Sequence, residues 1–271
     1  MSNSNHTEYI DTMKNRTGAK FLDQNEKRVH FYHIPKTGGR SIISSFGKII
    51  YPELNHKEAY KEITRRQVKN DQEYISCVVS DFGEYLFTYG HVEFHCINNP
   101  LRPVFRNNTV SQIHGLHPDC FTFTVLRDPI DRLFSLYKEF LSEVQQTNNR
   151  ENLSIYSSSV AFFEVNPKSF LSFVKSLPST HTYQQLYFFS SWMDHHEAIA
   201  NIRSLSAVGS TENTTQLMNS LSGHIKHELT LKDKFERISD YVISDKERDE
   251  VRKLLEPEYK FYYEALEGCN K

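Results

Sequence analysis

Two stretches of the chain pass from an apolar run to a polar turn and then to a helical pattern. In the first, VHFYHI is rich in β-branched and aromatic residues and ends at Pro35, and SIISSF then places Ile42, Ile43 and Phe46 on one side of a helix. In the second, Phe121–Leu126 is a continuous run of apolar residues and threonine, typical of a buried parallel strand. Each stretch therefore predicts a strand, a loop and a helix.

The start of the second helix is well marked in the sequence. Asp128 can cap it, Pro129 suits its first position, and Asp131 places negative charge in its first turn. The core-facing stripe that follows consists of Ile130, Leu133, Phe134, Tyr137 and Leu141. Ser135 lies off this stripe, so its hydroxyl is free to face a ligand.

Further elements complete an α/β pattern. EYLFTYGHVEFH predicts a strand that stops near Gly90, SAVGSTE a strand end around Gly209, and the charged segment from Asp245 to Leu266 a pair of helices. Residues 1–27 are polar and predict a flexible arm, and Gln145–Ser159 predicts a surface loop. We expect residues 28–271 to form a single domain with a central, mostly parallel sheet flanked by helices and a helical C-terminal part.

Composition and charge exclude some classes of function. The 271 residues carry a net charge of −2, which argues against a surface committed to nucleic acid or to anionic membranes. The N-terminus is polar and no apolar run is long enough to span a membrane, so we expect a soluble, cytoplasmic protein. The 4 cysteines form no CxxC pair and the histidines lack the spacing of a known metal site, so no metal is expected.

The turn PKTGGRS has the parts of an anion cradle. Its glycines permit positive φ and leave backbone N–H groups uncovered, Lys36 brings a positive charge, and the next helix presents its N-terminus. The Walker A order is absent because the glycines follow the lysine. An ordinary turn with an exposed lysine is the alternative.

A second junction favours the anion site. Arg127 directly follows a predicted strand and precedes a helix start, which is where open α/β sheets bind ligands. Two such junctions fit a nucleotide that carries two separated anionic groups.

The two motifs carry a family resemblance. HIPKTGGRS resembles the 5′-phosphosulfate-binding loop, and VLRDPIDRLFSLY the 3′-phosphate-binding segment, of sulfotransferases that use 3′-phosphoadenosine 5′-phosphosulfate (PAPS). The chain is most similar to the branch that includes heparan sulfate 2-O-sulfotransferases and their bacterial relatives, and AVGSTEN and EPEYKFYYEAL are weaker similarities. The resemblance implies a P-loop-like sulfotransferase fold.

The resemblance also implies the roles of individual residues. Lys36, the N–H groups of Thr37, Gly38 and Gly39, and the hydroxyls of Thr37 and Ser41 would hold the 5′-phosphosulfate, and Arg127 and Ser135 the 3′-phosphate. Arg40 belongs to the same cofactor-binding turn but stands where the family often has a small hydroxyl residue. YGHVEFH resembles the Gly-His segment that carries the family's catalytic histidine, so His91 would be the base, with Lys36 stabilising the leaving phosphate.

The expected reaction moves a sulfuryl group from PAPS to a hydroxyl or an amine of a small metabolite or carbohydrate, leaving 3′,5′-ADP. Two other functions stay open. An ATP-dependent small-molecule kinase would need a carboxylate for Mg²⁺, and no apolar run ending in Asp offers one. A noncatalytic protein of the same fold would bind the nucleotide without turnover. No oligomeric state is predicted.

Overall fold

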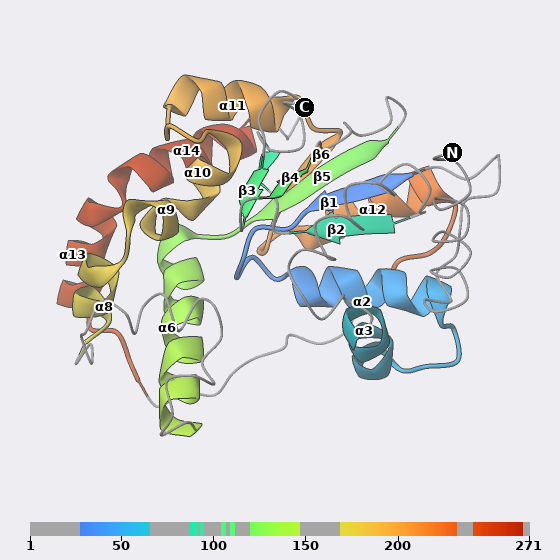
Figure 1. The fold of residues 1–271 in the computed structure, drawn as a ribbon, viewed down its shortest axis with the longest axis horizontal. Coiled ribbons are helices and arrows are strands. Elements are labelled where there is room, and N and C mark those ends of the chain that lie inside the picture. Colours follow the sequence, from blue (N-terminus) through green and yellow to red (C-terminus); the bar gives the residue numbers. More distant parts are fainter. Residues whose placement is uncertain are drawn as a thin grey trace. The chain divides into compact units, whose positions relative to one another are not determined.

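The computed structural model describes residues 28–65, 87–90, 93–94, 104–106, 109–111, 120–146, 169–231 and 241–267 (Figure 1). These residues divide into two compact units. The first contains the described residues up to His33, those from Gly39 to Thr124 and those from Thr215 to 231. The second contains Ile34–Gly38, the described residues from Val125 to Thr214, and 241–267.

Parallel strands form the centre of the first unit. Strand β1 (Val29–Tyr32) pairs in parallel with β2 (Phe87–Gly90) on one side and with the first four residues of β5 (Phe121–Leu126) on the other. The phenyl rings of Phe31 and Phe123 stack across β1 and β5 with centroids 4.7 Å apart. Burying two such rings stabilises the pairing by about 1.5–3 kcal/mol each.

The remaining elements of the first unit are helices and a hairpin. They are α2 (Gly39–Ile50), α3 (His56–Arg65), β3 (Val104–Arg106), β4 (Thr109–Ser111) and α12 (Thr214–Ile225), whose first residue belongs to the second unit. Helices α2 and α3 pack against each other (Figure 1). The antiparallel pairing of β3 with β4 has no counterpart among the elements that the sequence predicts.

The second unit contains the end of β5 and all of β6 (Ala207–Ser210), which lies beside β5 in the sheet. Its helices are α6 (Pro129–Gln146), α8 (Phe170–Ser176), α9 (Ser179–Thr182), α10 (Gln184–Phe189), α11 (His195–Arg203), α13 (Asp245–Leu254) and α14 (Glu256–Glu267). A buried cluster from α6, α8, α13 and α14 forms a core, which includes Leu133, Phe173 and Tyr259.

Several boundaries agree with the sequence. Strand β5 has the predicted bounds, β2 ends at Gly90, β6 surrounds Gly209, and α13 and α14 form the predicted C-terminal pair. The stripe on α6 differs from the prediction, because Leu136 and Phe140 are buried whereas the predicted Phe134 and Leu141 are only half-buried. The loop expected from Gln145 was placed too early, since α6 continues through Gln146.

The α/β class with parallel strands flanked by helices is therefore confirmed for the part of the chain that is described. The arm predicted for residues 1–27 lies outside the described residues. No helix among the described residues is long and apolar enough to cross a membrane.

Candidate functional site

The loop Ile34–Gly38 in the second unit has an unusual backbone. Lys36 has φ 71° and Gly38 has φ 82°. Glycine adopts such a conformation freely, whereas a residue with a Cβ does so at a cost and most often near functional sites. The Thr37 side chain is buried, and its hydroxyl donates to the Ile34 carbonyl at 2.9 Å. This hydroxyl therefore closes the turn that displays Lys36.

Lys36 forms an ion pair that the sequence analysis did not anticipate. Its Nζ lies 2.8 Å from Oε2 of Glu139, and each of these side chains is only 15% exposed. Glu139 follows Ser135 by four residues on α6, so the two project from the same side of that helix. Partial burial strengthens the attraction between the two charges. The ammonium group that was predicted to meet an anion thus already has an anionic partner.

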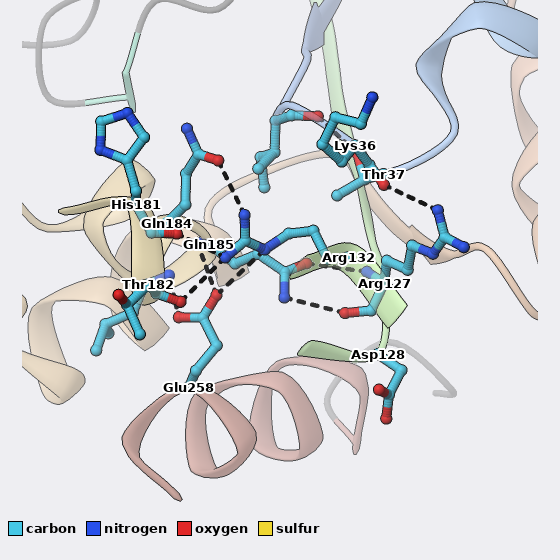
Figure 2. A network of polar contacts seen from close by, with 12 residues as sticks. Lys36, Thr37, Arg127, Asp128, Arg132, His181, Thr182, Gln184, Gln185 and Glu258 are labelled. Carbon is cyan, nitrogen blue, oxygen red and sulfur yellow. Dashed lines mark hydrogen bonds and ion pairs between the residues drawn. The ribbon is translucent and has the colours of Figure 1, made fainter. Parts of the chain in front are cut away.

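Arg127 brings the two predicted motifs together. One of its guanidinium N–H groups donates to the Lys36 carbonyl at 3.2 Å (Figure 2). Arginine carries five N–H donors, and within the described residues the other guanidinium N–H groups of Arg127 have no acceptor. Ser135 is half-buried, and its hydroxyl makes no hydrogen bond to any described residue. Both side chains keep donors available for a ligand.

The backbone of Arg127 is held by a side chain from α10. Gln185 accepts from the Arg127 N–H at 2.9 Å and donates to the Arg127 carbonyl at 3.0 Å (Figure 2). The next residue, Asp128, caps α6 as predicted by accepting from the N–H groups of Ile130 and Asp131 at 2.9 and 3.1 Å. Asp128 also accepts from the Tyr259 hydroxyl at 2.9 Å. Burial, together with the Asp128 carboxylate, raises the pKa of Tyr259.

A buried ion pair supports this arrangement. Arg132 is fully buried and donates to Gln184 Oε1 and to the carbonyls of His181 and Thr182, at 3.0, 2.8 and 3.0 Å. Its Nε lies 3.9 Å from Oε1 of Glu258, which is also fully buried.

The surroundings of this pair shift two pKa values. Burial raises the pKa of Glu258, and Arg132 and two backbone N–H groups oppose that shift only in part. Burial and the Arg132 charge together lower the pKa of His181.

Three predicted cofactor-binding residues lie in the first unit. Gly39 begins α2, and a Cβ built there would lie 2.1 Å from Nε2 of His33, so the position admits only glycine without movement of that ring. Arg40 is exposed, with its guanidinium carbon 6.0 Å from the centre of the Tyr60 ring. The half-buried Ser41 accepts from the hydroxyls of Ser44 and Ser45 through its carbonyl. Arg40 therefore has an aromatic neighbour within its own unit.

The predicted site residues thus fall into three groups. Lys36, Thr37, Gly38, Arg127 and Ser135 belong to the second unit, and Gly39, Arg40 and Ser41 to the first. The predicted base, His91, lies outside the described residues.

The sequence analysis missed Glu139 and Gln185. The four-residue spacing from Ser135 was a signal for Glu139. No pattern in the sequence marked Gln185.

Where the structure is described, no three His, Cys, Asp or Glu side chains gather closely enough to hold a metal ion. Neither the protein-family models nor the curated proteins gave a significant match to this sequence.

Proposed function

We propose that this protein is a PAPS-dependent sulfotransferase with a P-loop-like fold, which moves a sulfuryl group to a hydroxyl or an amine of a small metabolite or carbohydrate. The observation that carries the proposal is the contact between the Arg127 guanidinium and the Lys36 carbonyl, because it joins the two motifs that the resemblance assigns to the two ends of one nucleotide. The open donors of Arg127 and Ser135 add to this support.

In the proposed complex, Lys36 leaves Glu139 and binds the 5′-phosphosulfate, and the loop amides of Thr37 and Gly38 add further donors. Arg127 and Ser135 bind the 3′-phosphate. Each charge-assisted hydrogen bond of this kind contributes about 1.5–3 kcal/mol. Arginine suits the task because its planar fork matches two phosphate oxygens.

The proposed chemistry is a direct transfer. An acceptor oxygen or nitrogen forms a bond to sulfur while the bond between sulfur and the phosphate oxygen breaks, and that oxygen keeps the electron pair. The acceptor proton passes to His91, a role that rests on the sequence alone. Lys36 balances the charge that grows on the leaving phosphate, so positioning and electrostatics supply most of the rate.

Binding and transfer assays test this proposal. We expect the protein to bind 3′,5′-ADP in calorimetry, to prefer it to ATP with Mg²⁺, and to release it from labelled PAPS in the presence of acceptor pools. Arg127→Ala should weaken 3′,5′-ADP binding by about ten- to a hundredfold, the value of one charge-assisted contact. Arg203→Ala is the matched control, because the Arg203 side chain is 50% exposed and pairs with Glu264.

Three results would contradict the proposal. Failure to bind 3′,5′-ADP would remove its basis. A preference for ATP with Mg²⁺, together with Mg²⁺-dependent turnover, would favour the kinase. Binding of 3′,5′-ADP without transfer to any acceptor would favour a noncatalytic nucleotide-binding protein.

A further inference from the structure

The Gln185 side chain makes hydrogen bonds to the backbone of Arg127 in the way that a neighbouring strand would. Arg127 directly follows the last residue of β5, Leu126, whose carbonyl still accepts from Thr211 N–H at 2.9 Å. One residue later, the Arg127 N–H and carbonyl both bond to the Gln185 amide, at 2.9 and 3.0 Å. Gln185 is fully buried, so these two bonds are shielded from water. The peptide groups on both sides of the Arg127 Cα are therefore fixed.

Gln185 is itself held by a distant carboxylate. Helix α10 begins after Tyr183, which makes no side-chain capping bond. Instead, Glu258 from α14 accepts from the backbone N–H group of Gln185 at 2.9 Å (Figure 2). It also accepts from the backbone N–H group of Leu186 at 3.1 Å. Glu258 thereby caps α10 from outside, and Arg132 pairs with Glu258. A buried ion pair is costly to desolvate and stabilises little, so its benefit lies in fixing the position of this helix start.

The Arg127 side chain is held at its far end as well, through the bond from its guanidinium to the Lys36 carbonyl. A cation restrained at both ends loses little conformational freedom when it meets an anion. We infer that Gln185 is a positioning residue that orients Arg127 for the 3′-phosphate, and that it thereby sets a preference for nucleotides that carry one. This inference rests on the proposed function.

The test compares two nucleotides and two neighbouring glutamines. The affinities for 3′,5′-ADP and for 5′-AMP are measured by calorimetry, and their ratio reports the 3′-phosphate alone. We expect Gln185→Met to lower this ratio by about tenfold, the order of one charge-assisted hydrogen bond. In an Arg127→Ala background the same substitution should leave the ratio unchanged, because Gln185 acts through Arg127.

Gln184→Met is the matched control. Gln184 is also buried and bonds to Arg132, which keeps its bonds to the His181 and Thr182 carbonyls without it. Gln184→Met should lower the melting temperature and leave the ratio of the two nucleotide affinities unchanged. If Gln185→Met does not fold, Gln185→Glu is measured instead, and Gln184→Glu is then the control. Gln185→Glu keeps the acceptor for the Arg127 N–H and loses the donor to the Arg127 carbonyl.

The outcomes separate this inference from the proposed function. A wild-type protein that does not prefer 3′,5′-ADP to 5′-AMP would overturn both. A wild-type preference that Gln185→Met and Gln185→Glu retain, or that the Gln184 variants lose equally, would overturn the role of Gln185 alone. If Gln185→Met still lowers the ratio in the Arg127→Ala background, the role of Gln185 is overturned as well.

Discussion

Lys36 and Glu139 form an ion pair that would compete with the proposed nucleotide for the lysine. The ammonium and the carboxylate are 2.8 Å apart and mostly shielded from water, so their attraction exceeds that of a surface pair. In the proposed complex, the phosphosulfate would have to offer Lys36 a better partner than Glu139. Without a ligand, the ion pair restrains the Lys36 side chain, and the Lys36 backbone has a positive φ.

Glu139→Gln should therefore tighten binding of 3′,5′-ADP. Removal of the competing carboxylate releases Lys36 from this ion pair and leaves the length of the side chain at position 139 unchanged, so we expect the dissociation constant to fall by about three- to tenfold. Calorimetry at fixed ionic strength measures the effect. Glu256→Gln, at an exposed position of α14, makes the same charge change as a control. An unchanged affinity in Glu139→Gln, or an equal gain in the control, would contradict this prediction.

The starts of two helices differ in how much the sequence reveals. Helix α6 begins at Pro129, directly after its cap Asp128. This pattern is local, because Asp128 accepts from backbone N–H groups of the same segment, and the structure confirms it. Helix α2 begins at Gly39, and the reason for glycine there is the imidazole of His33, which stacks on Phe31 at 5.0 Å. That requirement arises from packing between a loop and a helix, so the sequence marks the glycine without giving its cause.

Two glycine substitutions in helices should have opposite effects on stability. Gly39→Ala places a Cβ against the His33 ring, and moving the ring gives up its stacking on Phe31, so we expect a loss of about 1–3 kcal/mol. Gly223→Ala in α12 meets no atom within 4 Å and should gain about 0.5–1 kcal/mol from the better helix propensity of alanine. Urea unfolding measures both. A Gly39→Ala variant as stable as the wild type would refute the assigned contact.

The two units are interleaved along the chain. The chain passes from one unit to the other after His33, Gly38, Thr124 and Thr214, and the described residues 241–267 belong again to the second unit. The candidate site residues follow this division, with Lys36 and Gly39 only three positions apart but assigned to different units. No single cut of the chain therefore yields either unit complete.

Global stability should depend on pH through His30. This side chain is fully buried, and burial lowers its pKa to about 3. As the pH falls below about 6.5, the unfolded chain binds a proton at this histidine and the folded chain does not, so folding loses about 1.4 kcal/mol per pH unit from this group until the pH nears 3.

The difference between wild type and His30→Gln isolates this contribution. Urea unfolding from about pH 7 to pH 4.5 should show a shallower loss of stability in His30→Gln than in the wild type, whatever the variant's stability at neutral pH. His196→Gln, at an exposed histidine, should keep the wild-type slope. Equal slopes in wild type and His30→Gln would contradict the prediction.

Local patterns were sufficient to predict β5, the cap of α6, the strand end at Gly90 and the C-terminal helices, because each is specified by residues adjacent in the chain. The same patterns predict Lys36 and Arg127 as partners for anions, and this stays a prediction. They could not reveal that Glu139 pairs with Lys36 or that Gln185 bonds to the backbone of Arg127, since these contacts join residues 103 and 58 positions apart. A glutamate or a glutamine carries no local mark of its distant partner, so the tertiary structure alone decides which lysine is paired with a carboxylate and which arginine has its backbone held by a buried side chain.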